Sequence, residues 1–388
     1  MFRPFAYSFR RELRRIAKHP SHMIILTLGI IFSYVFFLTL MDEGQPENLP
    51  IGVVDMDGSY LSRRLCHELD ATQGISIKAV YSSHREAREA MQRQEIYAFV
   101  EIPHGTYADL LDFKTPHLSM YINNAYLLAG SLSWKTLLTM SNLASGAVQR
   151  EILRKQGFDE ERIMGLIQPI VVDTHQIGNP MANYPAYLLT TILPGILALL
   201  VLLMSIYAVG VELKDQTSRE WIAACQGDVT AAVLGKLTPY TLWFSFLAIV
   251  GNIVLFVFFR FPIEGPFWVL QLAIVGVVVA MQAIGVFLVG VLPVMRDAIS
   301  IGAFYGILGF SLSGFTYPVT HMGPALQALC NFFPLRHYYM IYVHSAMFNN
   351  TLSLYWPHVC AMVAFLLLPA ITHRRLSRAY NLMNYPLK

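Results

Sequence analysis

Few of the residues that could do chemistry in this sequence stand at the spacings that a catalytic or metal site needs. Asp55 and Asp57, in VVDMDGS, could hold a metal ion or a phosphate, but no third ligand or glycine-rich cradle accompanies them. An Asp-x-Asp-Gly sequence after a strand more often forms a turn and caps the next helix, and we expect that role here. The histidines of the same region also lack ligand spacing: His67, His84, His104 and His117.

Neither nucleotide hydrolysis nor dithiol redox chemistry is predicted by the sequence. Gly235-Lys236 is followed by Leu237, and Thr230 stands where a phosphate-binding loop requires glycine, so the Walker A pattern is missing. The four cysteines share no CxxC spacing and predict neither a zinc ribbon nor a redox pair. We therefore expect no cofactor, no metal and no ATPase site in this chain.

The elements that would position these residues are mostly apolar. Of the 388 residues, 55% are hydrophobic and only 14% are charged, whereas soluble domains average roughly 25% charged residues. Six runs without Asp, Glu, Lys or Arg approach the about 20 residues that cross a bilayer as a helix. We expect the first run to be a retained anchor, because it exceeds a signal-peptide core and no cleavage site follows. The predicted spans are Met23–Met41, Ala186–Gly210, Leu237–Phe259, Phe267–Val291, Ala298–Tyr317 and Trp356–Ile371.

In the tails and short loops, basic residues lie predominantly on one side of these spans. With six spans both tails share a side, and the short loops on the other side carry only Arg260 and Arg336. The positive-inside rule therefore places both termini in the cytoplasm, and we predict a bacterial inner-membrane protein. The residues on the cytoplasmic side are Arg3, Arg10, Arg11, Arg14, Arg15, Lys18, Lys214, Arg219, Lys236, Arg296, Arg374, Arg375, Arg378 and Lys388.

The amino-terminal segment has the pattern of an amphipathic helix. Phe2, Phe5, Phe9, Leu13 and Ile16 form one helical stripe with arginines around it. A basic amphipathic helix of this kind lies flat at the headgroups, so we expect an elbow helix on the cytoplasmic leaflet. The alternative is a basic tail that only sets the topology.

Residues 42–183 differ from the rest in composition and lie outside in this topology. They carry 12 Lys and Arg against 18 Asp and Glu. Strand-like and helix-like segments alternate along them, which predicts a mostly parallel sheet covered by helices. The predicted strands are Leu49–Asp55, Ile75–Tyr81, Ile96–Ile102 and Leu118–Ile122, with Val171–Ile177 returning to the sheet.

The predicted fold class is an α-helical integral membrane protein of about six transmembrane helices with an inserted α/β extracytoplasmic domain. The predicted parts are a cytoplasmic basic helix (1–22), the first span (23–41), the extracytoplasmic domain (42–183), five further spans (184–371) and a cytoplasmic tail (372–388).

Two segments between the spans are unusual for plain loops. In the cytoplasmic loop 211–236, a short helix would place Glu212, Asp215, Arg219 and Glu220 mostly on one side, where a soluble partner could dock by charge. In 315–340, prolines interrupt an apolar, aromatic stretch, which predicts short broken helices re-entering the outer leaflet. The alternatives are a solvated loop and an ordinary extracytoplasmic loop. The re-entrant segment is marked by Phe315, Pro318, Pro324 and Pro334.

In this order and spacing, these features resemble the permease subunits of type-2 ABC exporters over nearly the whole chain. The resemblance rests on IGVVDMDGSYLSRRL and LSMYINNAYLLAG in the outer domain, on VELKDQTSREWIAACQGDVTAAVLGKL, and on SGFTYPVTHMGPALQALCNFFPLRHYYMIY. It implies separate ATP-binding subunits that hold ATP and Mg²⁺, a second permease copy or a homologous permease, and a possible periplasmic adaptor. The coupling residues that it implies are Glu212, Lys214, Asp215, Arg219, Glu220, Asp228, Arg296 and Asp297.

The predicted function is export of a hydrophobic or amphipathic substrate, of the drug, lipid or glycan class, driven by those ATP-binding subunits. A membrane-anchored sensor or scaffold is the alternative, but it needs neither a charged loop nor a re-entrant segment. A lipid-modifying enzyme would need a carboxylate beside His321, Arg336, His337 or His344, and none is nearby in sequence. Proton coupling is disfavoured because the predicted spans hold only His358 as a titratable imidazole. The expected partners are proteins and the lipid bilayer, not nucleic acid.

Overall fold

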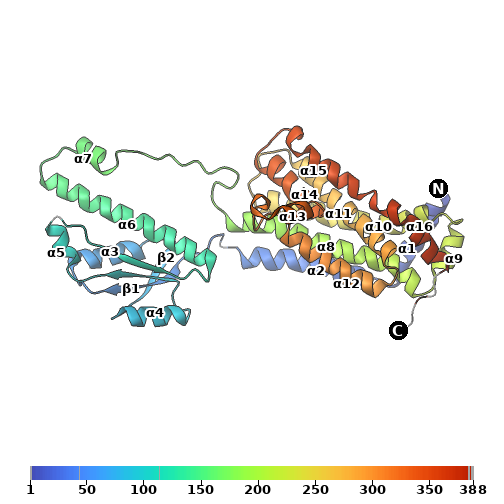
Figure 1. Ribbon diagram of the computed structural model, residues 1–388, viewed down its shortest axis with the longest axis horizontal. Helices are drawn as coiled ribbons and strands as arrows, with labels where there is room; N and C mark the ends of the chain where they lie inside the picture. Colours follow the sequence, from blue (N-terminus) through green and yellow to red (C-terminus); the bar gives the residue numbers. More distant parts are fainter. Residues whose placement is uncertain (1, 43, 113, 383–384, 386–388) are drawn as a thin grey trace. The chain divides into compact units, whose positions relative to one another are not determined.

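The computed structural model describes residues 2–42, 44–112, 114–382 and 385, and it divides into two compact units (Figure 1). One unit joins Met1–Asp42 to His175–Lys388, and the other consists of Glu43–Thr174. The first unit is helical, and the second contains the one sheet that the described residues form. The predicted fold class, a helical membrane protein with an inserted α/β domain, is confirmed.

Five helices of the first unit are long and apolar enough to cross a bilayer. The run predicted as the fifth span, Ala298–Tyr317, differs, because its helix α12 (Met295–Ser311) begins before the run, ends at Ser311 and has only 17 residues. The chain turns soon after Ser311 at Gly314, whose φ is +91°, and Pro318 follows. The expected six spans are therefore five long helices and one shorter helix packed on α8. The five are α2 (Ser21–Leu40), α8 (Tyr184–Lys214), α10 (Val229–Ile253) with η1 (Val254–Phe258), α11 (Phe267–Val291), and α15 (Leu352–Phe365) with α16 (Leu368–Leu382).

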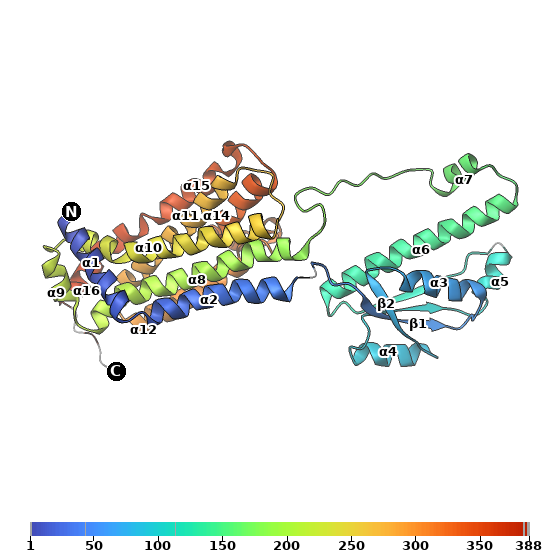
Figure 2. The same cartoon turned by 180° about the vertical axis from the view of Figure 1, so that it is seen from behind.

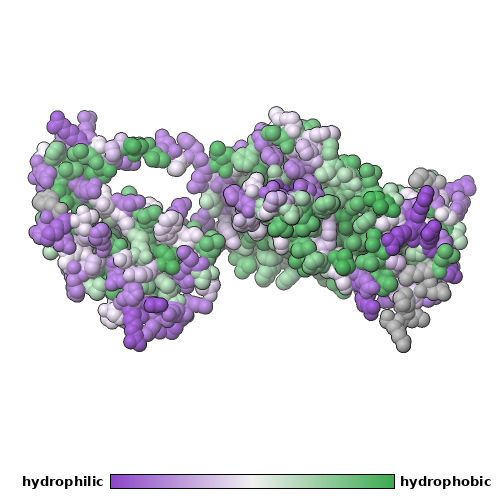
Figure 3. Space-filling view, viewed as in Figure 1, coloured by the Kyte–Doolittle hydropathy of each residue, from purple (hydrophilic) through white to green (hydrophobic). Residues whose placement is uncertain are grey.

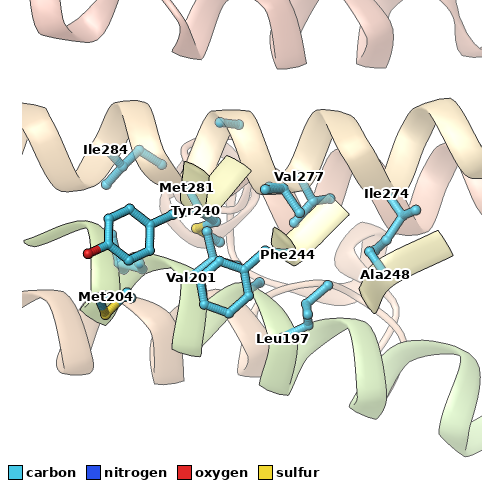
Figure 4. Packing of buried hydrophobic residues seen from close by; sticks show 14 of the residues in the cluster. Leu197, Val201, Met204, Tyr240, Phe244, Ala248, Ile274, Val277, Met281 and Ile284 are labelled. Atoms are coloured by element: carbon cyan, nitrogen blue, oxygen red, sulfur yellow. The ribbon is translucent and has the colours of Figure 1, made fainter. Parts of the chain in front are cut away.

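Helix α11 lies at the centre of the helical unit, where it packs against α8, α10, α12, α14 (Pro334–Ile341), α15 and α16. Apolar side chains of α8, α10 and α11 fill the space between these helices, as Figure 4 shows for Val201, Phe244 and Val277. Small residues bring the helices close, since a Cβ added at Gly285 of α11 would lie 2.8 Å from the Cβ of Ser205. The three helices are thus packed as one core.

Apolar side chains also cover the outside of the helical unit, where hydrophobic residues line its flank in Figure 3. On α2, Ile25 and Phe32 are both 66% exposed, and on α12, Phe304 and Ile307 are both 61% exposed. An apolar surface of this extent is unusual for a protein in water and suits the hydrocarbon of a membrane.

The second unit is built around a four-stranded sheet in the order β2-β1-β3-β4. Strands β1 (Leu49–Asp55), β2 (Ile75–Val80) and β3 (Ala98–Ile102) are parallel, and β4 (Ser119–Ile122) is antiparallel to β3. Side chains alternate between the two faces, so that Ile51 and Val53 pack under Leu137 of α6, whereas Val54 packs under α4. The covering helices are α3 (Tyr60–Asp70), α4 (His84–Gln92) and α6 (Leu127–Lys155), and the short helix α5 (Thr106–Leu111) follows β3.

One predicted strand of this unit is wrong. Val171–Ile177 was expected to return to the sheet, but the segment is irregular and exposed, and it follows the short helix α7 (Glu160–Ile167). Its apolar residues are consecutive and then give way to Asp173-Thr174-His175-Gln176, so the segment lacks the alternation that a half-buried strand needs. Both of its valines are more than 70% exposed.

Candidate functional site

The predicted coupling loop lies at one end of the helical unit (Figures 1 and 2). The end of α8 leads into α9 (Ser218–Ala224), which is followed by the start of α10. Helix α1 (Phe2–Lys18) crosses this end against α10 and α9, and α16 also contacts α9. The amino-terminal helix and the loop are therefore parts of one site.

The side of α1 that faces α10 is polar and closely packed. Pro4, Ser8 and Glu12, at four-residue spacing, are its buried residues. The hydroxyl of Ser8 donates to the carbonyl oxygen of Ala232 at 2.6 Å. At Gly235, an added Cβ would collide with the carbonyl oxygen of Phe5. A larger residue at position 235 would therefore push the two backbones apart.

Next to this contact lies a buried ion cluster, which consists of Glu12, Glu212 and Lys236 with the flanking Arg11 and Arg15. The Nζ of Lys236 lies 2.5 Å from Glu12 Oε2 and 2.6 Å from Glu212 Oε1. Arg11 donates two hydrogen bonds to the two oxygens of Glu212, at 2.7 and 3.0 Å. Arg15 Nη1 lies 3.1 Å from Glu212 Oε1. The cluster thus joins α1, α8 and α10 through charges that water does not reach at Glu212 and Lys236, both 0% exposed.

The cluster carries equal numbers of positive and negative charges when Asp215, at its edge, is counted. Asp215, half exposed, lies 3.5 Å from Arg15, so three cations face three carboxylates. The remaining carboxylate oxygens are also satisfied, because Tyr240 donates to Glu12 at 2.7 Å and Thr217 donates to Glu212 at 2.5 Å. A buried carboxylate that keeps all its partners is tolerated, whereas loss of one partner of a buried ion pair typically costs ~3–5 kcal/mol.

Arg11 illustrates how the cluster holds its charges. Partial burial alone would lower the pKa of the guanidinium, but its hydrogen bonds and charge attraction to Glu212 raise the pKa above the ordinary value. Arg11 therefore stays charged at any physiological pH. At Cys225, which directly follows α9, burial raises the pKa of the thiol and so keeps it protonated.

Helix α9 is fixed to this site through its buried side. Trp221 is 1% exposed, and its indole nitrogen donates to Ser8 Oγ at 3.1 Å. The Trp221 ring packs edge-on against Tyr380 of α16 at 5.4 Å, and Lys236 Nζ lies 5.2 Å from the ring centre. Ser218 donates to the carbonyl oxygen of Tyr380 at 2.9 Å. A force applied to α9 would therefore reach α1, α10 and α16 directly.

The opposite side of α9 and the preceding turn are open to solvent. Lys214, Asp215, Arg219 and Glu220 are all exposed there, as the sequence predicts for a docking surface. Glu212 is the exception, because it belongs to α8 and is 0% exposed. The expectation that Glu212 shares the exposed side with the others is corrected: it holds the loop from inside.

The other predicted coupling residues occupy two places. Asp228 is half-buried and caps α10, since its carboxylate accepts a hydrogen bond from the backbone nitrogen of Ala231 at 2.9 Å. Arg296 and Asp297 begin α12, are exposed, and lie 3.4 Å apart in an ion pair. The structure thus brings Arg219 and Glu220 together on one surface and leaves Asp228 in a structural role.

Sequence reasoning missed the pairing of Glu12 of α1 with Lys236 of α10 in the buried ion cluster. Glu12 is the one acidic residue in α1, among six basic ones, and Lys236 comes directly before a charge-free run. These two positions carried a signal, because an isolated charge of opposite sign often marks a specific partner. Their pairing across 224 residues is not visible in the spacing of either segment.

We predict that Gly235→Leu weakens the contact between α1 and α10. The added side chain would collide with the backbone of α1, and overpacking of this kind typically costs ~1–3 kcal/mol. The measurement is the thermal unfolding midpoint of the purified protein in detergent. Gly29→Leu in α2 is the matched control, since nothing lies within 4 Å of a Cβ there. Equal midpoints for the two variants would contradict the close contact.

The predicted re-entrant segment forms short helices separated by turns. They are η2 (Val319–His321), α13 (Pro324–Cys330) and α14, which continues without a turn into η3 (Tyr342–Met347) beyond the predicted segment. Pro324 and Pro334 stand in the first turns of α13 and α14, where a missing backbone N–H costs nothing. Phe315 is 6% exposed, and its carbonyl oxygen accepts a hydrogen bond from Tyr187 of α8 at 2.7 Å, whereas Pro318 is exposed.

Of the histidines considered for a lipid-modifying enzyme, His321 lies 3.1 Å from the Thr320 hydroxyl, whereas His337 and His344 lie near His358. His337 and His358 lie 3.0 Å apart through their Nδ1 atoms, and His337 Nε2 donates to the carbonyl oxygen of Asn331 at 2.9 Å. His344 pairs with Asn350 at 3.2 Å. Among the described residues, no carboxylate lies within hydrogen-bond distance of these three imidazoles.

Asp55 in the outer unit caps a turn, as the sequence predicts. Its Oδ1 accepts hydrogen bonds from the backbone nitrogens of Asp57 and Gly58, and its Oδ2 accepts one from the Ser62 hydroxyl at 2.7 Å. Ser59 caps the first turn of α3 through the nitrogen of Ser62. Within the described residues, no group of three or more His, Cys, Asp or Glu side chains is arranged to hold a metal ion.

Comparison with known proteins agrees with this arrangement. Residues 22–372 match the family described as "ABC-2 family transporter protein". Over 366 residues the chain is 21% identical to the probable multidrug ABC transporter permease YbhR of Escherichia coli strain K12, which covers 92% of this chain and 94% of that protein. The protein of the same name from Escherichia coli O157:H7 gives the same identity and coverage.

Proposed function

Since the chain belongs to the ABC-2 family of transporter proteins, we propose that it is the membrane-spanning permease of an exporter whose ATP is hydrolysed by separate subunits. The observation that carries the proposal is that α9 exposes one side to solvent and packs its other side against α1, α10 and α16. Its outer side exposes Arg219 and Glu220, and its inner side is held by Ser218 and Trp221. A soluble subunit that grips the outer side could thus move the membrane helices.

The buried ion cluster supplies the rigid connection that this mechanism needs. A push on α9 passes through Trp221 to α1 and α16, and through Lys236 and Glu212 to α10 and α8. Helices α8 and α10 in turn pack on the central helix α11. We propose that closure of the ATP-binding subunits rocks these helices together and opens a substrate path on the other side of the membrane.

The orientation of the chain in the membrane and its partners are part of the same proposal. We place α1, α9 and the carboxyl-terminal tail in the cytoplasm of a bacterial inner membrane, because the basic residues gather on that side. A second permease copy or a related permease would complete the transporter. The exposed apolar faces of α2 and α12 can meet either such a copy or lipid. A periplasmic adaptor that binds the outer unit is a further partner in this proposal.

For the substrate, we propose a hydrophobic or amphipathic molecule of the drug, lipid or glycan class. The relatives in the two Escherichia coli strains are named as multidrug permeases. The helical core is lined by apolar side chains, and none of the predicted spans carries an ionisable carboxylate or amine. Such a core suits a substrate that carries little charge and enters from the membrane or from the cytoplasm.

The test is transport by proteoliposomes that contain this chain and its ATP-binding subunit. We expect ATP-dependent movement of a lipophilic fluorescent dye, which stops when the Walker A lysine of the ATP-binding subunit is replaced by alanine. Transport that continues with the inactive subunit would contradict energisation by a partner. Binding of the dye without any transport in either sample would favour a sensor or scaffold instead.

A further inference from the structure

Helix α1 has three faces, of which one packs against the helical unit. Pro4, Ser8 and Glu12 face α10, and the apolar stripe that includes Phe2 and Leu13 is partly exposed, at 82% and 43% for these two. The third face is basic. Arg3, Arg10, Arg14 and Lys18 recur at spacings of seven, four and four residues, which places them on one side of the helix.

This basic face borders a groove of about 790 Å³ between α1 and the turn that leads from α8 to α9. Arg3, Arg10, Arg14 and Lys18 contribute its charges, and Tyr7 and Thr217 also line it. Within the described residues, none of the four basic side chains has a carboxylate at ion-pair distance. The acidic side chain in the lining, Asp215, is already paired with Arg15 at 3.5 Å.

The chain connectivity places one end of the groove at the membrane surface. Lys18 and His19 line that end, and α2, the first membrane-crossing helix, begins at Ser21. At about 1.5 Å of rise per helical residue, Arg14 and Lys18 lie within about two helical turns of the hydrocarbon boundary. Phosphates of the lipid headgroups occupy this depth, and the apolar stripe of α1 suits the adjacent acyl chains.

We propose that this groove binds the phosphate group of an anionic phospholipid from the cytoplasmic leaflet. Arg10 and Arg14 would donate hydrogen bonds to the phosphate oxygens, for which the planar guanidinium is well suited. Tyr7 would lie at the level of the glycerol backbone, as tyrosines at membrane interfaces do. The lipid would then be a neighbour of Arg11 and Arg15, which hold Glu212 from the same helix. Its presence would brace α1 against the coupling site.

An acidic surface of a soluble protein is the other occupant that charge alone would allow. The position of the groove favours lipid, because Lys18 and His19 line it and come just before Ser21, where α2 begins. The exposed side of α9, which we propose as the protein contact, carries both signs of charge rather than one. The binding site does not depend on transport, so a failure of one proposal leaves the other testable.

The experiment measures lipid binding to the full chain, purified in maltoside and stripped of lipid. Native mass spectrometry follows a titration with dioctanoyl phosphatidylglycerol. We expect binding at least tenfold tighter than that of dioctanoyl phosphatidylcholine, and R10Q/R14Q should weaken it by about tenfold or more, because each basic residue near an anionic headgroup contributes to the attraction. R374Q/R378Q is the matched control: it removes two exposed arginines of α16 that lack partners among the described residues.

Each outcome decides the proposal. A selective loss in R10Q/R14Q, with R374Q/R378Q within twofold of the unchanged protein, supports it. An equal loss in both variants, or equal binding of the two lipids, overturns it in favour of unspecific attraction. Equally tight binding of glycerol phosphate would identify a site for soluble anions and overturn the lipid assignment. If R10Q/R14Q binds the lipid normally but no longer copurifies with the ATP-binding subunit, the groove is a protein contact.

Discussion

Lys236→Met is expected to lower the stability of the helical unit more than other single charge removals in the chain. Lys236 is 0% exposed and is the cation that both Glu12 and Glu212 contact. Without it, Glu212 keeps Arg11 and Arg15, whereas Glu12 is left with the hydroxyl of Tyr240 as its described side-chain partner. An uncompensated buried carboxylate typically costs ~3–5 kcal/mol. Thermal unfolding of the protein in detergent measures the effect.

Two further variants make this result specific to the buried ion cluster. Lys214→Met removes the same charge from an exposed position in the last turn of α8, and we expect its unfolding midpoint to stay close to that of the unchanged protein. Adding Glu12→Gln to Lys236→Met removes the orphaned charge and should restore part of the loss. If Lys236→Met is no less stable than Lys214→Met, the cluster does not hold the site together.

Glu220→Lys is expected to abolish most of the functional coupling while the protein remains folded. Glu220 lies on the exposed side of α9 and has no partner among the described residues, so its replacement disturbs no internal contact. A reversed charge at a complementary interface places like charges together, which we expect to weaken binding of the ATP-binding subunit by roughly tenfold to a hundredfold. The measurements are copurification of the two subunits and ATP-dependent transport in proteoliposomes.

The control for this variant is Glu264→Lys. Glu264 is exposed in the loop between η1 and α11, which connects the other ends of the membrane helices. The same charge reversal there should leave both copurification and the unfolding midpoint unchanged. A Glu220→Lys protein that copurifies and transports normally would remove the outer side of α9 from the mechanism.

The fold was predictable where neighbouring residues determine the structure. The strand Leu49–Asp55 was predicted at its observed bounds, because a β-branched apolar run between turn residues is a strong local signal. The long spans were predictable from charge-free runs alone. Ala298–Tyr317 was overextended, since apolar composition does not reveal that the chain turns at Gly314. Val171–Ile177 was misassigned because its apolar residues do not alternate with its polar ones, which lie together in the middle of the segment.

The candidate site was predictable only on its exposed side. Arg219 and Glu220 stand out in the sequence as charges in a cytoplasmic loop, and they are exposed. The buried side could not be predicted, because it depends on residues that are far apart in the sequence. Glu12 and Lys236 are separated by 224 residues. The sequence interpretation placed Glu212 in the loop. In the structure α8 extends to Lys214, so Glu212 belongs to α8 and is buried. Long-range charge pairing of this kind has no local pattern.

The most direct measurement of the central claim is photo-cross-linking from position 220 during ATP turnover. A photoreactive residue placed at Glu220, in a complex of this chain with its ATP-binding subunit, should yield an adduct with that subunit. The same residue placed at Glu264 should not. An adduct from position 264, or the lack of one from position 220 in a complex that is transporting, would contradict the proposal that force enters through α9.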